Sequence, residues 1–100
     1  MDRIARLLRP DSIAVVGAST AQNKLAGMLI PTLLAGGYKG RIYPVNPRYA
    51  EVAGQRCYAS LDEVPGPVDH CVIVVGRERI AEVLKACRRK GVAGASIFTS

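Results

Sequence analysis

The sequence of 100 residues predicts an α/β protein built on a parallel β-sheet. Two observations carry this prediction. Short apolar strands alternate with amphipathic helical segments, and the first strand runs directly into a glycine. Strands that are apolar on both faces are typical of parallel sheets covered by helices on both sides.

The first half of the chain predicts a helix, a strand and a second helix. A short helix over 4–8 ends at Pro10, and the apolar run over 12–16 is a buried strand. A second helix is expected over about 24–35. Pro31 removes a hydrogen bond inside it, so this helix either kinks or begins later.

The second strand covers 41–45 and contains Pro44. Because proline cannot donate to a strand ladder, this strand either lies at an edge or ends there. Ser60-Leu61-Asp62-Glu63 has the form of a capping box and predicts one short helical turn. A strongly apolar third strand follows over 71–75.

An apolar repeat between Ile80 and Cys87 predicts a last helix that ends at Gly91. A fourth strand covers 95–98. Together these segments predict a Rossmann-like parallel sheet, half of a doubly wound α/β fold, with its four strands in the order 3-2-1-4 and truncated after the fourth strand. The domain is expected to cover 1–100 and to be incomplete at its C-terminal end.

The charge balance favours a polyanionic partner. Fourteen Lys and Arg against eight Asp and Glu give a net charge of +6. Nucleic acid is not expected, because one Phe, no Trp and no basic run longer than Arg88-Arg89-Lys90 leave little for base stacking. The basic cluster over 85–90 is expected to be solvated, and a phosphorylated small molecule explains the same charge. No apolar run is long enough for a membrane span or a secretory signal, so no membrane is expected.

The three cysteines, Cys57, Cys71 and Cys87, lie far apart, and His70 is the single histidine. Neither a metal site nor a disulfide framework is expected, and a reducing cytoplasm is the predicted compartment. Cys71 and Cys87 fall at apolar positions of a strand and a helix, which predicts that both are buried.

The turn over 16–20 is the candidate binding site, because ligands of such sheets bind beyond the carboxyl ends of the strands, where the strand order reverses. This turn is expected to face the end of the fourth strand. Gly17 permits a close backbone approach to an anion, Ser19 and Thr20 add hydroxyl groups, and Lys24 adds a positive charge.

A nicotinamide cofactor fits this turn poorly. The G-x-G-x-x-G fingerprint requires glycine where the chain has Ser19. It also requires an acidic residue at the end of the second strand, where the chain has Val45-Asn46-Pro47-Arg48. Without a carboxylate and with Arg48 nearby, the pocket suits a ribose that carries phosphate. NAD is therefore disfavoured, and NADP stays an alternative.

Two motifs resemble a known family. The segments LLRPDSIAVVGAS over 7–19 and GRIYPVNP over 40–47 closely resemble the CoA-binding domain of NDP-forming acyl-CoA synthetases, with succinyl-CoA synthetase alpha subunits as more distant relatives. The similarity continues through 60–64, 68–69, 91–92 and 97–100 and covers essentially the whole chain.

The resemblance implies coenzyme A as the ligand, used as a substrate, with Arg48 meeting a phosphate. One departure from the family is Val75-Gly76, where a Val-Pro pair is usual, and Gly76 is expected to loosen that wall of the pocket. The resemblance, together with the turn chemistry, places in the site Gly17, Ala18, Ser19, Thr20, Lys24, Val45, Asn46, Pro47, Arg48, Thr99 and Ser100.

The resemblance also implies a reaction: an acid–CoA ligase forms an acyl-CoA thioester from a carboxylate, ATP and CoA through a phosphohistidine. His70 stands at the entry to the third strand, opposite the expected site, so no catalytic residue is assigned in this chain. The phosphohistidine, ATP and Mg are expected in other ligase domains or a partner subunit, and the chain alone is expected to be inactive. The alternatives are a non-catalytic CoA-binding module, the ligase-like part of a protein acetyltransferase and an NADP-binding oxidoreductase domain.

Overall fold

The computed structural model describes residues 3–21 and 23–98. All the helices and strands expected from the sequence are present, and the short hairpin β3–β4 and the 3-10 turn η2 are additional. In chain order the elements are α1 (Arg3–Leu8), β1 (Ser12–Val16), α2 (Leu25–Ala35), β2 (Arg41–Val45), β3 (Glu51–Val52), β4 (Gln55–Arg56), η1 (Leu61–Glu63), β5 (His70–Ile73), η2 (Arg77–Arg79), α3 (Ile80–Lys90) and β6 (Gly94–Ile97).

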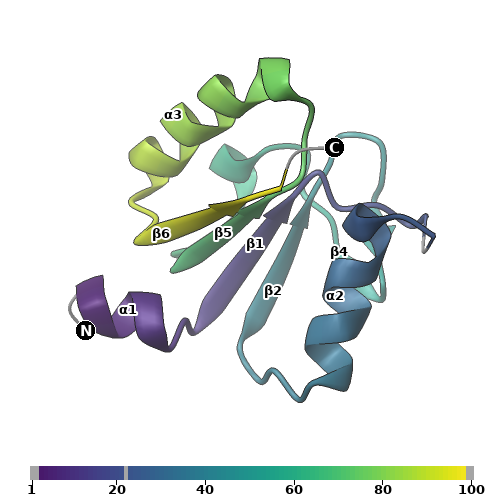
Figure 1. The fold of residues 1–100 in the computed structure, drawn as a ribbon, viewed down its shortest axis with the longest axis horizontal. Helices are drawn as coiled ribbons and strands as arrows, with labels where there is room; N and C mark the ends of the chain where they lie inside the picture. Colours follow the sequence, from purple (N-terminus) through teal and green to yellow (C-terminus); the bar gives the residue numbers. More distant parts are fainter. Residues whose placement is uncertain (1–2, 22, 99–100) are drawn as a thin grey trace.

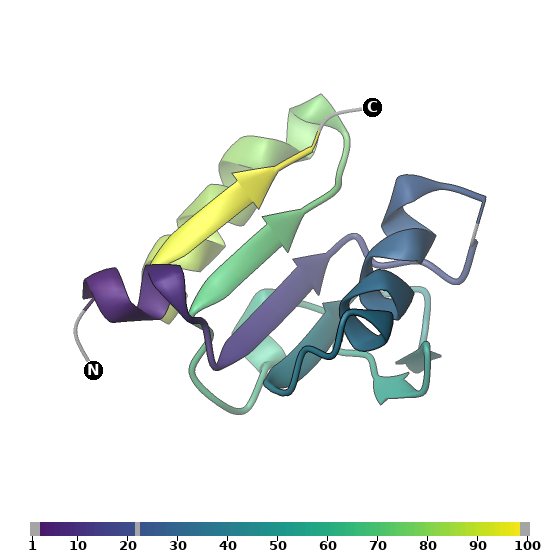
Figure 2. The same ribbon diagram turned by 60° about the horizontal axis from the view of Figure 1, so that its bottom comes forward.

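The four long strands form one parallel sheet in the order β2-β1-β5-β6 (Figures 1 and 2). The α/β, Rossmann-like fold class is confirmed, but the predicted order 3-2-1-4 is wrong: counted as strands one to four, the order is 2-1-3-4. The Pro44 carbonyl points away from β1 and accepts a hydrogen bond from the Tyr58 N–H at 2.9 Å. In a strand the nitrogen and the carbonyl of one residue lie on the same side, so the Pro44 nitrogen, which carries no proton, also faces away from β1. This favours an edge position for β2.

Helices cover both faces of the sheet (Figure 1). On one face α2 and the β3–β4 hairpin pack over an apolar cluster that includes Val15, Ile30 and Ile42. On the other face α3 and η1 pack over a cluster that includes Cys71 and Cys87, which are buried as predicted. All five residues of β1 are buried, because this strand has a neighbouring strand on each side and an apolar cluster on each face of the sheet.

The helix ends follow their sequence signals only in part. The short turn predicted at 60–63 is present as η1, but the expected capping box is not formed: the Ser60 side chain caps no backbone N–H, and its Oγ donates to the Glu63 carboxylate at 3.3 Å. Pro31 lies inside α2, so the alternative of a later helix start is wrong. Gly91 ends α3 in the left-handed conformation at φ 75°, as expected of a C-cap glycine. Within residues 3–21 and 23–98, no helix has the length and apolar character that a membrane span requires.

Candidate functional site

The site is organised by the glycine turn that follows β1. The Gly17 N–H donates to the Val45 carbonyl at 2.8 Å, while the Val74 N–H donates to the Val16 carbonyl at 2.8 Å. The turn therefore passes between the ends of β2 and β5. The expectation that it faces the fourth strand is wrong, because β6 lies outside β5. The strand order reverses between β1 and β5, which is the usual position of a ligand crevice in this type of sheet.

Only glycine fits at the head of this turn. Gly17 has φ 92°, and a Cβ atom there would overlap the Val74 carbonyl oxygen and come within 2.9 Å of its carbon. The sequence predicted that Gly17 lets the backbone come close to an anion. In the structure the atoms that come close to Gly17 belong to Val74, at the end of β5.

The next residues of the turn are held by local hydrogen bonds. Ala18 is fully buried, and the Ser19 Oγ accepts a hydrogen bond from the Ala21 N–H at 3.0 Å. Hydrogen bonds from the side chains of Ser19 and Thr20 lower the pKa of the Tyr49 phenol. Tyr49, which follows β2, was missed by the sequence analysis, because only the tertiary structure brings it to this turn.

Asn46 links the turns after β1 and β2. Its Nδ2 donates to the Ala18 carbonyl at 2.8 Å, and its Oδ1 accepts from the Arg48 N–H at 2.9 Å. Both ends of the Asn46 amide are thus engaged within the chain. Its role in this structure is to position the two turns.

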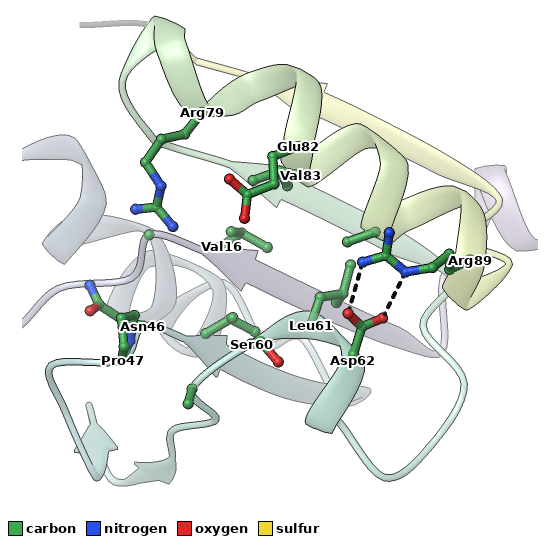
Figure 3. Close-up of a pocket in the computed structure, with 14 residues that line it drawn as sticks. Val16, Asn46, Pro47, Ser60, Leu61, Asp62, Arg79, Glu82, Val83 and Arg89 are labelled. Atoms are coloured by element: carbon green, nitrogen blue, oxygen red, sulfur yellow. Dashed lines mark hydrogen bonds and ion pairs between the residues drawn. The ribbon is translucent and has the colours of Figure 1, made fainter.

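A cleft with a mixed polar and apolar lining opens on the α3 side of the glycine turn, and its charged side chains make it the polar cleft of the two (Figure 3). Four predicted site residues line it: Gly17, Val45, Asn46 and Pro47. The opposite wall comes from η1 and the face of α3, which the sequence analysis did not place in the site. The charged and hydroxyl side chains of this wall are Ser60, Asp62, Arg79, Glu82 and Arg89.

One end of the polar cleft is closed by an ion pair between Arg89 and Asp62, with an N–O distance of 2.8 Å. The hydrogen bond from Arg89 lowers the pKa of the Asp62 carboxyl. The Lys90 Nζ also donates to the Val64 carbonyl. The expectation that the basic cluster over 85–90 is only solvated is therefore wrong, because two of its members tie α3 to the η1 region.

A second, largely apolar cleft opens on the α2 side of the turn. The first residues of α2, including the predicted Lys24, form one wall, and Val74-Val75-Gly76 and Phe98 form the other. Gly76 adopts φ −60° and ψ 152°, an extended conformation. Thr99 and Ser100, also predicted in the site, lie outside the described residues.

The remaining predicted side chains lie apart from the two clefts. Arg48 is exposed and lines neither of them. His70 lies at the amino end of β5, where its Nε2 is 2.9 Å from the Ser96 Oγ and burial lowers its pKa. It stands at the end of the sheet opposite to the clefts, as expected.

The fold and its crevice define the chain as a doubly wound, parallel α/β domain. Its clefts lie at the switch point, where the strand order reverses between β1 and β5. Residues 11–100 match the CoA binding domain family, and the chain belongs to that family. A curated relative, the ADP-forming acetate–CoA ligase of Methanocaldococcus jannaschii, is 40% identical over 91 residues. The match covers 91% of this chain and 13% of that ligase.

Solved structures show the same relationship. The acetyl-coenzyme A synthetase 1 of Ca. Korarchaeum cryptofilum superposes with a TM-score of 0.91 at 39% identity, covering 97% of this chain and 21% of that one. A conserved hypothetical protein of Pyrococcus furiosus superposes with a TM-score of 0.78 at 34% identity, covering 87% of this chain and 73% of that one. The chain thus spans a small part of its ligase relatives and most of this smaller protein.

Proposed function

We propose that this chain binds coenzyme A at the carboxyl edge of its sheet, as the CoA-binding part of an ADP-forming acid–CoA ligase. The observation that carries the proposal is the pair of clefts on either side of the Gly17 turn, one with charged side chains on a mixed polar and apolar lining and one largely apolar. Coenzyme A has a charged phosphoadenosine end and a long pantetheine arm, so a crevice with these two characters suits it. The membership of the chain in the CoA binding domain family supports the same ligand.

The predicted site residues take different parts in this proposal. Gly17 and Ala18 shape the turn, Ser19 and Thr20 bring hydroxyl groups, and Lys24 directs a cation toward the phosphates. At the end of β2, Val45, Asn46 and Pro47 line the polar cleft, and the exposed Arg48 that follows them is proposed to meet a phosphate from outside the cleft. Thr99 and Ser100 are proposed to complete the wall after β6.

The whole-protein activity we propose is thioester formation from a carboxylate, ATP and CoA. Its phosphohistidine and its ATP and Mg sites are assigned to other domains or a partner subunit, since His70 lies at the far end of the sheet. This chain alone should therefore show no ligase activity. The proposed compartment is the cytoplasm, which agrees with three free cysteines.

A non-catalytic CoA-binding module is the second candidate. It is favoured by the Pyrococcus furiosus protein, because the chain covers 73% of that small protein. The sequence that flanks this chain in its gene separates the two candidates: phosphohistidine and ATP-binding domains favour the ligase, and their absence favours the module.

Calorimetric titration of the chain with CoA, dephospho-CoA and NADP tests the binding proposal. We expect CoA to bind most tightly, and Lys24→Ala to weaken it by about tenfold, equivalent to about 1.4 kcal/mol. Lys39→Ala is the matched control. Lys39 is exposed and lies just before β2, at the amino ends of the strands, whereas the clefts lie at their carboxyl ends. Tighter binding of NADP than of CoA, or no binding of CoA, would refute the proposal.

A further inference from the structure

The first turn of α3 carries two charged side chains that the proposed function leaves unused. Arg79 is the N-cap residue of α3, and Glu82 follows three positions later, on the same face of the helix. Figure 3 shows both side chains projecting over the polar cleft toward the ends of β1 and β2. Among residues 3–21 and 23–98 the ion pairs are Arg6–Asp69 and Arg89–Asp62, so the charges of Arg79 and Glu82 are not neutralised by such a pair.

Arg79 is the guanidinium group best placed for an anion in this cleft. Arg89 also lines the cleft, but Asp62 already neutralises it at 2.8 Å. Arg48 lines neither cleft. A planar guanidinium group matches the geometry of a phosphate, with which it forms paired hydrogen bonds.

Glu82 requires a different chemical group beside it. A carboxylate repels a phosphate but accepts hydrogen bonds from neutral donors such as a ribose hydroxyl. In many dinucleotide-binding domains an acidic residue at the end of the second strand accepts from the ribose. That position is Asn46 here, and the Asn46 amide is engaged with Ala18 and Arg48. Glu82 projects from the facing helix instead, where its carboxylate suits a neutral donor that is not next to the phosphate, such as the adenine amino group.

We propose that Arg79 and Glu82 recognise the phosphoadenosine end of coenzyme A, with Arg79 binding the 3′-phosphate and Glu82 accepting a hydrogen bond from the adenine amino group. This assignment rests on the proposed function and deepens it, because it names the side chains that distinguish CoA from dephospho-CoA. Lys24 then serves the diphosphate, which both ligands share, and Arg48, which lines neither cleft, takes no part in the preference for CoA.

The test is calorimetric titration of CoA and dephospho-CoA into the chain and its Arg79→Gln and Glu82→Gln variants. We expect the wild-type chain to prefer CoA by about tenfold or more, as for one charge-assisted phosphate contact. Arg79→Gln should remove this preference by weakening CoA alone. Glu82→Gln should weaken both ligands by the same factor, because it acts on the part that they share.

Arg77→Gln is the matched control, because it removes the same charge from an exposed neighbouring residue that lines neither cleft. In Arg77→Gln the ratio of the CoA affinity to the dephospho-CoA affinity should stay at the wild-type value. Thermal melts should show that all three variants fold, since Arg77, Arg79 and Glu82 are exposed. A wild-type chain that binds both ligands equally, an unchanged ratio in Arg79→Gln, or an equal loss in Arg77→Gln would overturn this inference and leave CoA binding standing. A wild-type chain that binds neither ligand would instead refute the proposed function.

Discussion

Gly17 occupies a crowded backbone position of the crevice, where the ends of β1, β2 and β5 meet. Its φ of 92° and the nearby Val74 carbonyl both exclude a side chain. Gly54, in the β3–β4 hairpin, has a similar φ of 78°, but a Cβ atom there would meet nothing within 4 Å. The two glycines therefore separate the cost of the backbone conformation from the cost of the steric overlap.

We expect Gly17→Ala to destabilise the fold by about 3 kcal/mol or more, because backbone strain of about 1–3 kcal/mol adds to an overlap with β5. Gly54→Ala should cost only the backbone contribution, about 1 kcal/mol. Urea unfolding of both variants measures the difference. Equal losses would show that the strand ends separate easily and that Gly17 is not sterically required.

At the scale of elements, Asp69 fastens α1 and the start of β1 to the sheet. Its carboxylate accepts from the Arg6 Nε at 2.6 Å and from the Asp11 N–H at 2.8 Å. A second nitrogen of Arg6 donates to the Val68 and Gly91 carbonyls. Burial acts to raise the pKa of Asp69, but these hydrogen bonds and the Arg6 charge outweigh it, so the pKa is lowered overall.

Asp69→Asn should lower the free energy of unfolding at pH 7 by about 1.5–3 kcal/mol, the usual range for hydrogen bonds to a charged group. Because the folded-state pKa is lowered, this stabilisation is complete above the unfolded value of about 3.9 and disappears as the pH falls through the folded value. Denaturant titrations at pH 7 and pH 3 should show the gap between wild type and variant closing at low pH. The exposed Glu51→Gln should show no such gap, and a pH-independent gap for Asp69→Asn would contradict the linkage.

The connection from β5 to α3 offers a second change at the scale of elements. Gly76 already has φ −60°, close to the value that a proline ring imposes, and no backbone hydrogen bond of its N–H occurs among the described residues. The departure from the family's Val-Pro pair therefore leaves this backbone in a proline-like conformation.

Gly76→Pro should raise the free energy of unfolding by about 0.4–1 kcal/mol, because it restricts the unfolded chain without changing the folded backbone. The Glu78 carboxylate must move aside, which is a small change for an exposed, flexible side chain. Thermal melts of wild type, Gly76→Ala and Gly76→Pro measure the effect. A lower melting temperature for the proline variant than for the alanine variant would contradict this account of the connection.

At the scale of the whole molecule, one sheet with a helical layer on each face leaves all three cysteines buried and free. A hydrogen bond with the Cys87 thiol and burial both raise the pKa of Cys71. Burial likewise raises the pKa of Cys57, whereas the hydrogen bond with Cys71 lowers the pKa of Cys87, so burial rather than a raised pKa is what protects Cys87. Thiol reactivity therefore reports on the opening of the fold, since the reactive species is an accessible thiolate.

A thiol-specific disulfide reagent should modify the native chain slowly at pH 8 and rapidly in guanidinium. Saturation with desulfo-CoA, which lacks the thiol that would itself consume the reagent, at a hundredfold excess over its Kd should slow the reaction of the native chain by about a hundredfold, since binding stabilises the fold by about 2.7 kcal/mol. In the Cys57→Ser variant the remaining labelling comes from Cys71 and Cys87, which lie under α3. Fast labelling of any cysteine without denaturant would contradict a uniformly closed core.

Much of the fold could be predicted from local patterns. The fully apolar run of β1, the glycine at its end and the apolar stripe of α3 each depend on neighbouring residues, so periodicity and cap residues were sufficient to locate them. The site was predicted in part: the turns after β1 and β2 are brought together, and four of the predicted residues line the polar cleft. Glu82 was missed because its charge also fits the simpler role of complementing the helix dipole, and Arg79 was missed because no motif in the sequence marks it.

The strand order and the composition of the clefts were decided only by the tertiary structure. The side of β1 on which β5 pairs depends on the path of the long crossover after β2, and no local pattern encodes that path. The contacts that shape the site also join distant residues: Asn46 meets Ala18 across 28 positions, and Arg89 meets Asp62 across 27. The spacing of apolar residues along the chain specifies which segments become strands and helices. The faces of α3 and η1 enter the crevice only because packing of the apolar core places them over the carboxyl edge of the sheet.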